Sequence, residues 1–343
     1  AIKLGLSDPV EEIGKNDSDF FPEEQAQVTE NKKYKFLEPD ELMERIKNKE
    51  TFILIDTLTG IHFEKVHLPG ARSACVFEVT FLEQVKAIAE DKKAEIVLYG
   101  SSGRSRDALT AAEKLQCEGY ENISVLNGGL EAWRERRFEL RGDQPDMADP
   151  ETVLRLDDGK YSVDSAQSVI EWSGRNPNSK HFGTVGIKRG KVEVNHSILT
   201  GVVDIDMDSI DNISLKGDEL HPVLTSHLKS DDFFFVKIFP SAVLTIKEGL
   251  PVKTPFLSIP NYELNATLEL RGVKADLAFQ ATVARTEGGG LAAEAHFDID
   301  RTRWGAIYGS ARFFENLGMH LVFDLISFQV KIVTTNENSH SFV

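Results

Sequence analysis

The chain has 343 residues, a formal net charge of -16 at pH 7 and a pI near 5.1. That length accommodates about two domains, each large enough to bury its own core. The acidic charge argues against nucleic acid and anionic membrane surfaces as partners, because binding to phosphates needs positive charge. The sequence contains no run of about 18 apolar residues, so we expect no membrane span.

The first residues lack the basic region and apolar core of a signal peptide, which predicts a cytoplasmic protein; a mature form left after cleavage would instead be periplasmic. Cys75 and Cys117 fit a reducing compartment, and we expect both as buried small hydrophobes. His221 and His227 are six positions apart, with nothing nearby to complete a tetrahedral set. We therefore predict no metal and no cofactor, and the sequence leaves a homo-oligomer open.

Residues 1–33 are acidic and uneven in pattern, which predicts an extended arm. Short apolar runs that indicate strands buried on both faces then alternate with helical patterns. The predicted strands cover residues 52–56, 95–99 and 123–126, and the predicted helices start at residue 39 and cover residues 80–90 and 106–118. Such alternation indicates a parallel sheet with helices on both sides, so the first domain is predicted to be α/β.

A glycine- and serine-rich loop follows the predicted strand that ends at Tyr99. In parallel sheets, functional sites lie at the carboxyl ends of the strands. This loop leads into a helix, so several backbone N–H groups and the helix dipole point at one place, and two arginines add positive potential. We predict that it binds a small anion through Gly100, Ser101, Ser102, Gly103, Arg104, Ser105 and Arg106.

Residues 34–140 resemble a rhodanese domain. Four segments carry the resemblance in order: Asp56, His-Leu-Pro-Gly-Ala at residues 67–71, the strand, loop and helix around Tyr99, and residues 119–133 with Asn-Gly-Gly-Leu-Glu-Ala-Trp at their end. In that family a cysteine opens the active loop and carries the transferred sulfur as a persulfide. This chain has Gly100 at that place.

Sulfur transfer needs a soft nucleophile of low pKa, and neither Gly100 nor the following serines supply one. The domain is therefore predicted to be catalytically degenerate and to bind an anion or a protein partner. The alternative is a sulfurtransferase that acts through Cys75. Thr57 stands where the family usually places an arginine, so we expect a structural role for Asp56.

Beyond a polar linker the helical pattern nearly disappears, and about eight segments alternate apolar with polar residues. This pattern predicts a lipocalin-like, eight-stranded antiparallel barrel, whose interior is either just filled or able to hold one small ligand. The predicted strands are residues 160–172, 183–194, 197–208, 235–247, 262–270, 274–285, 291–300 and 323–333. Two insertions, at residues 224–234 and 307–321, each carry a phenylalanine pair and are expected to cover the barrel mouth.

The second half resembles the YceI-like lipid-binding family over residues 160–333. The matching segments, in order, are residues 161–164, 168–172, 228–234, 268–273 and 301–305. The resemblance implies a barrel with an apolar tunnel for a long-chain lipid, such as a polyisoprenoid or a fatty-acid derivative. Because no catalytic residue is established for that fold, it also implies carriage or sequestration.

Alternation on the strands and the second phenylalanine pair nominate the side chains that would contact this ligand. They are Val203, Ile205, Met207, Leu264, Leu268, Phe279, Ala281, Ala295, Phe297, Ile299, Phe313 and Phe314. An ordinary filled core explains the same pattern. Each methylene removed from water contributes about 0.8 kcal/mol, so a long chain needs no polar contact. Arg271 and Arg303 are expected to pair with strand carboxylates at the rim.

The predicted organisation is an arm (1–33), a rhodanese-like domain (34–140), a linker (141–159), a barrel (160–335) and a tail (336–343). Three functions remain open on this basis. The chain is a lipid carrier with a degenerate rhodanese-like module, a sulfurtransferase with a non-standard cysteine, or a protein with two filled cores and no ligand.

Overall fold

The computed structural model describes residues 34–147 and 153–337. The chain forms two compact units, residues 1–150 and 151–343. The predicted acidic arm lies outside the described residues, as do most of the predicted tail and the middle of the predicted linker.

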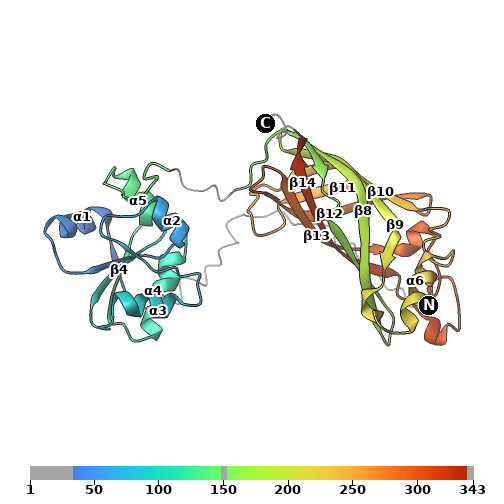
Figure 1. The fold of residues 1–343 in the computed structure, drawn as a ribbon, viewed down its shortest axis with the longest axis horizontal. Coiled ribbons are helices and arrows are strands. Elements are labelled where there is room, and N and C mark those ends of the chain that lie inside the picture. Colours follow the sequence, from blue (N-terminus) through green and yellow to red (C-terminus); the bar gives the residue numbers. More distant parts are fainter. Residues whose placement is uncertain (1–33, 148–152, 338–343) are drawn as a thin grey trace, which may run out of the picture. The chain divides into compact units, whose positions relative to one another are not determined.

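The first unit is a five-stranded parallel sheet with flanking helices, as predicted (Figure 1). The strand order is β1-β5-β4-β2-β3. The strands are β1 (Lys35–Leu37), β2 (Ile53–Asp56), β3 (Arg72–Ser73), β4 (Glu95–Tyr99) and β5 (Asn122–Leu126). The helices are α1 (Pro39–Lys47), α2 (Gly60–Lys65), α3 (Phe81–Ile88), α4 (Asp107–Cys117) and α5 (Gly129–Glu135).

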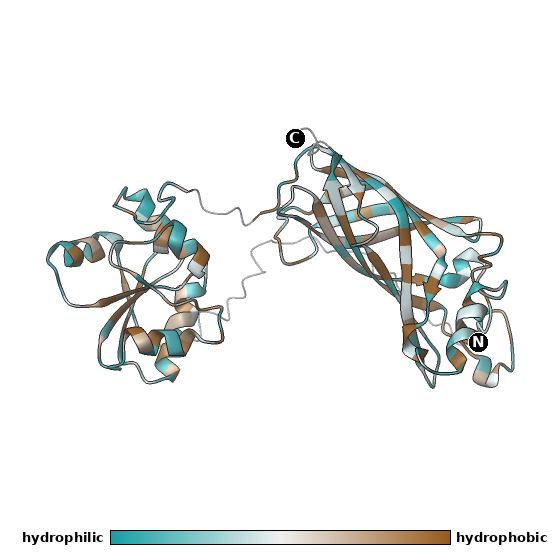
Figure 2. Ribbon diagram, viewed as in Figure 1, coloured by the Kyte–Doolittle hydropathy of each residue, from teal (hydrophilic) through white to brown (hydrophobic). Residues whose placement is uncertain are grey.

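The sheet of the first unit is buried on both faces. Along β4, Ile96 and Leu98 pack with α3 and α4, whereas Val97 and Tyr99 pack with α1 and α5. Continuous apolar runs are required for a strand covered on both sides, and Figure 2 shows them as hydrophobic stretches in the centre of the unit. This arrangement places the carboxyl ends of β2 and β4 next to each other, beside the loop at residues 100–106.

The second unit is an antiparallel barrel. Its strands are β6 (Gly159–Val163), β7 (Val169–Arg175), β8 (Lys180–Asn195), β9 (Ile198–Asp211), β10 (Ser241–Pro251), β11 (Tyr262–Leu270), β12 (Val273–Arg285), β13 (Leu291–Asp300) and β14 (Leu325–Asn336). Consecutive strands from β8 to β14 pair with one another. Strands β6 and β7 each pair with β14 on one side and with β8 on the other, so together they take one position in the sheet. The nine strands therefore form a closed barrel with eight strand positions.

The strand predicted at residues 160–172 is therefore two strands. Asp164 ends β6, because its carboxylate accepts hydrogen bonds from the N–H groups of Ala166 (2.9 Å) and Gln167 (3.2 Å) and folds the chain into a turn. The predicted strand at residues 235–247 also starts too early. Phe235 has a left-handed φ of 47°, and β10 begins only after Pro240.

Two insertions lie at one end of the barrel, which we call the lid end (Figure 1). The first follows β9 and contains η2 (Ile213–Leu215) and α6 (Leu220–Lys229). The second joins β13 to β14 and contains η3 (Arg301–Trp304) and η4 (Gly318–His320).

The opposite end is closed by a segment that the sequence assigned to the linker. Leu154 and Leu156 are buried against Tyr161 and Leu264, and the Leu154 N–H donates to the Pro255 carbonyl (2.9 Å). Residues 153–158 thus belong to the barrel unit.

Asn261 anchors the loop between β10 and β11 at that closed end. Its amide donates to the Phe256 and Val283 carbonyls and accepts from the Val283 N–H at 2.8 Å, and Asn261 itself is not exposed to solvent.

We expect Asn261→Ala to lower the free energy of unfolding of the barrel by about 2–4 kcal/mol, because buried backbone groups lose their partners. Urea unfolding checks this, with Asn265→Ala on the neighbouring strand as a control; equal effects of the two variants would contradict it.

Candidate functional site

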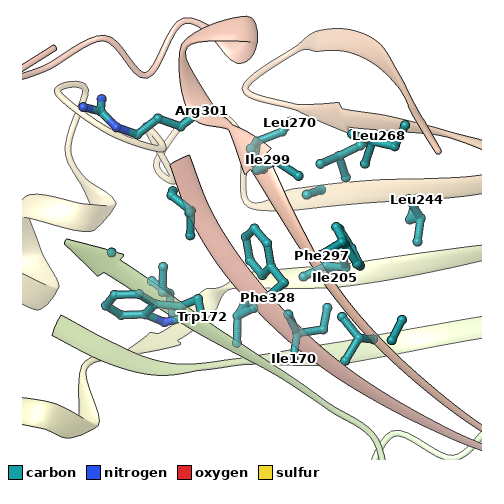
Figure 3. Close-up of a pocket in the computed structure, with 18 of the residues that line it drawn as sticks. Ile170, Trp172, Ile205, Leu244, Leu268, Leu270, Phe297, Ile299, Arg301 and Phe328 are labelled. Atoms are coloured by element: carbon teal, nitrogen blue, oxygen red, sulfur yellow. The ribbon is translucent and has the colours of Figure 1, made fainter. Parts of the chain in front are cut away.

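The barrel encloses a cavity of about 390 Å³ with an almost wholly apolar lining. Strands β7 to β14 all contribute side chains to it. Figure 3 shows some of these side chains, including Ile205, Phe297 and Phe328, converging on the space between the strands. Closure of the sheet thus leaves room that the barrel's own side chains do not fill.

Strand alternation creates the lining. On β9, Val203 and Met207 are buried and face the cavity, whereas Val202 is 46% exposed. The structure brings together ten of the twelve side chains nominated from the sequence: Val203, Ile205, Met207, Leu264, Leu268, Phe279, Ala281, Ala295, Phe297 and Ile299. The other two, Phe313 and Phe314, are about half exposed and are not part of the lining.

The sequence reasoning missed lining residues on β7 and β14. They are Ile170, Trp172, Ile326, Phe328, Val330 and Ile332. On β14 these residues alternate with Ser327, Gln329 and Lys331, so the same signal was present there. Phe233 and Phe234, the first phenylalanine pair, are buried and do face the cavity from the lid end.

Stacked aromatic rings form the middle of the lining. Phe279 and Phe297 lie with ring centroids 4.4 Å apart and 19° between their planes, and Phe328 follows at 5.9 Å from Phe297. Phe297 packs against both apolar clusters of the barrel, so the stack lies between the two ends of the lining.

An aromatic cluster covers the lid end of the cavity. His227 on α6 contacts Phe233 and Tyr308 edge to face, with ring centroids 5.0 and 4.7 Å away. The His227 Nε2 atom lies 3.0 Å from the Asp232 carboxylate. Because Tyr308 belongs to the second insertion, this cluster joins the two insertions over the barrel.

Arg301 ties the second insertion to the end of β13. It is 1% exposed, and its guanidinium donates to the carbonyls of Ala306, Val322 and Phe323. Burial lowers the pKa of this guanidinium. Through these three carbonyls and Asp324, whose carboxylate lies 3.7 Å away, Arg301 supports the lid end (Figure 3).

The rim arginines differ from expectation. Arg271 donates to the Phe233 carbonyl and Arg303 to the Asp276 carbonyl (2.8 Å), so both bind backbone oxygens. Arg303 also helps to lower the pKa of the Asp276 carboxyl, after the larger effects of Lys247 and Thr267. The polar lining near the lid end consists of Arg175, Asn176, His181, His227, Arg301 and His320. Few polar groups can therefore orient a bound molecule.

The loop of the first unit holds a carboxylate of the chain itself. Asp107 is 5% exposed and accepts from the N–H and the hydroxyl of Ser101, both at 3.0 Å. A Cβ atom on Gly100 would lie 1.8 Å from this carboxylate. Asp107 thus occupies the space into which a side chain at position 100 would project.

The arginines of this loop also have internal partners. Arg104 pairs with Glu131 (2.8 Å) and Arg106 with Glu113 (3.3 Å). The loop was predicted to bind an external anion, but at its Gly100 end such an anion would meet the charge of Asp107. The sequence reasoning missed Asp107, although an acid in the first turn of a helix is a recognisable signal.

Asp56 lies at the carboxyl end of β2 without exposure to solvent. Its carboxylate accepts from the Leu58 N–H at 2.8 Å, which fits the structural role expected for it. Burial raises its pKa to about 6, although Tyr99, Leu58 and His67 act in the opposite direction.

The two cysteines differ in exposure. Cys75 is buried, as expected, and its N–H donates to the Gln84 side chain at 3.0 Å. Cys117 was expected to be buried and is exposed, because it lies at the end of α4, beyond the part of the helix that packs on the sheet.

Among the residues that the structure describes, no cluster of three or more His, Cys, Asp or Glu side chains is placed to hold a metal ion. Within residues 34–147 and 153–337, no helix combines the length and apolar character needed to cross a membrane.

Comparison with protein families identifies both units. The sequence model of the YceI-like domain matches residues 161–334, about half of the chain. The chain belongs to the YceI-like family. The model of the rhodanese-like domain matches residues 38–136, so this YceI-like protein carries a rhodanese-like domain before its barrel. No curated protein matches the chain.

Solved structures with similar folds are distant from this YceI-like protein. BcnA of Burkholderia cenocepacia is 18% identical, with 50% of this chain and 99% of that chain covered and a TM-score of 0.41. A polyisoprenoid binding domain from Saccharophagus degradans is 15% identical, with coverages of 51% and 98% and a TM-score of 0.36. The rhodanese-like domain of the Anabaena sp. Alr3790 protein is 24% identical, with coverages of 35% and 92% and a TM-score of 0.28.

The raised pKa of Asp56 predicts a pH-dependent stability of the rhodanese-like domain. The folded state binds a proton on the Asp56 carboxyl more tightly than the unfolded state does. Protonation of Asp56 therefore stabilises the folded domain at low pH, and this stabilisation is lost as pH rises from about 4 to about 6. We expect Asp56→Asn to remove this pH dependence of the free energy of unfolding, which amounts to about 3 kcal/mol in all. Hydrogen exchange of β2 and β4 at pH 5 and pH 7, between which about 1.3 kcal/mol of this dependence falls, measures it, with Asp40→Asn as a surface control. An Asp56→Asn effect that is the same at both pH values would be inconsistent with this account.

The position of Asp107 predicts that a cysteine cannot simply be restored. We expect Gly100→Cys to lower the thermal midpoint of the rhodanese-like domain, because its Cβ meets the carboxylate, and Gly100→Cys/Asp107→Ser to recover most of the loss. Without the neighbouring charge, alkylation of the new thiol at pH 7 should be about tenfold faster in the double variant. Cys117→Ser in both backgrounds keeps the exposed thiol from contributing. A Gly100→Cys variant as stable as the parent would refute the assignment.

Proposed function

We propose that the barrel binds one long-chain apolar molecule, a polyisoprenoid or a fatty-acid-like lipid, and that the protein is a carrier for it. The observation that carries this proposal is the closed barrel with an unfilled apolar cavity of about 390 Å³. That volume lies within the range of ligand pockets, about 300–1,000 Å³.

The energetics favour an occupant. Unfilled apolar cavities cost about 24 cal/mol per Å³, so this cavity would cost on the order of 9 kcal/mol, as much as a typical domain's whole stability. Water is a poor occupant because it needs two to four polar partners, and most of the lining offers none. A long hydrocarbon chain gains about 0.8 kcal/mol for each buried methylene. Membership of the YceI-like family supports a lipid as the molecule that carries this hydrocarbon chain.

The rhodanese-like domain is proposed to act as a partner-binding module without sulfur transfer. Its active loop holds Asp107 where the family's nucleophile would lie, and the Cys75 thiol is 3% exposed. A small anion at the Gly100 end of the loop would have to displace Asp107 from Ser101. The proposed activity of the chain requires no cofactor.

Chain-length titration tests the carrier function. We expect one bound molecule per protein and an affinity that rises about fourfold with each added methylene until the cavity is full. Long-chain alcohols of increasing length, added to the lipid-stripped full chain and followed by calorimetry, give both values.

Two neighbouring valines on β9 provide a matched pair. Val203→Trp places a large side chain in the cavity and should weaken binding by at least about tenfold, whereas Val202→Trp points outward and should leave it unchanged. Thermal unfolding of both variants verifies the fold. Equal binding by the two variants, or no binding by the parent chain, would exclude the cavity as the site.

A further inference from the structure

Large apolar side chains are exposed around the lid end of the barrel. Those on α6 and on the insertion between β13 and β14 form a group that we call the mouth rim: Leu220, Val223, Phe313, Phe314, Met319 and Phe323. Their exposed fractions run from 45% for Phe314 and Phe323 to 82% for Met319. Single exposed apolar residues are ordinary, but a contiguous group beside a cavity marks an interaction surface.

The two segments of the mouth rim lie next to each other. His227 of α6 contacts the Tyr308 ring, and the Tyr308 hydroxyl lies 3.4 Å from His320 Nδ1. Leu224 and Leu228, which follow Leu220 at helical spacing on one side of α6, contribute to the cavity lining. Apolar side chains on this helix thus run from the exposed Leu220 to the cavity.

Met319 and Phe323 connect the surface to the cavity. Both line the cavity and both are exposed to solvent, so these two side chains join the outer surface of the barrel to the cavity lining. A chain that entered past them would meet apolar side chains at the mouth.

We propose that the mouth rim docks on a lipid bilayer, from which the apolar ligand enters the cavity. This inference rests on the proposed function. Long apolar chains reside in bilayers, and each methylene that leaves the bilayer for water lowers the population of the water-exposed lipid about fourfold. A protein surface that contacts the bilayer beside the cavity mouth spares the lipid this passage through water.

The charge of the chain defines the kind of bilayer. The net charge is -16, Glu219 and Glu315 adjoin the mouth rim in sequence, and Arg312 beside Phe313 is paired with Asp300 (2.6 Å). Attraction to anionic lipid is thus absent as a driving force, and docking depends on insertion of the apolar side chains. We expect stronger docking on zwitterionic than on anionic vesicles.

Transfer from vesicles tests the proposal. The full chain is mixed with phosphatidylcholine vesicles that contain a fluorescent polyene fatty acid, and uptake is followed in time. We expect Val223→Asp/Phe313→Asp to slow uptake by about tenfold or more, because two inserting side chains become charged. Leu257→Asp/Ile259→Asp, at the closed end of the barrel, is the control and should transfer at the parental rate; both residues are exposed.

Delivery of the same fatty acid from ethanol separates docking from binding. The mouth-rim variant should then bind with parental affinity, since neither Val223 nor Phe313 lines the cavity. If the parent chain fails to bind from ethanol, the proposed function fails. If the mouth-rim variant takes up the fatty acid from vesicles at the parental rate, or if the parent accepts it only from a loaded carrier protein and not from vesicles, the bilayer-docking proposal is overturned.

Discussion

Closure of the barrel is the constraint on which the rest of the second unit depends. β14 pairs with β13 on one side and with β6 and β7 on the other, and β6 and β7 in turn pair with β8. The sheet therefore closes without a free edge. For a closed sheet, strand number and stagger set the width of the interior. Small residues such as Ala281 and Ala295, which are paired on the neighbouring strands β12 and β13, leave part of the barrel interior unfilled. The cavity is thus a consequence of backbone geometry combined with short side chains.

The two ends of the barrel are built differently, which gives the cavity a direction. Leu154, Leu156 and Tyr161 pack into the closed end, and Asn261 fixes the adjoining loop by hydrogen bonds to buried backbone groups. At the lid end, contacts among aromatic rings join two insertions, and Arg301 holds one of them through carbonyl groups. The lining residues Met319 and Phe323 are exposed at the lid end, which favours opening there.

Strand alternation predicted the fold class and most of the cavity lining, because period two is a local property of the sequence. What it did not predict depends on contacts between distant residues. The roles of the two phenylalanine pairs were indistinguishable locally, since burial of Phe233 and exposure of Phe313 depend on how the insertions fold over the barrel. The glycine- and serine-rich loop was recognisable as a strand-to-helix turn. That Asp107 folds back onto Ser101 depends on the space left by Gly100, a three-dimensional fact.

The central claim is that the cavity holds a long hydrocarbon chain in the protein as the cell makes it. Denaturing extraction of the full chain, purified without detergent, followed by mass spectrometry of the organic phase tests it most directly. The account predicts close to one equivalent of a single class of long-chain compound, and a marked reduction in the Val203→Trp protein. An extract free of such compounds, together with an experimental structure in which side chains fill the barrel interior, would contradict it.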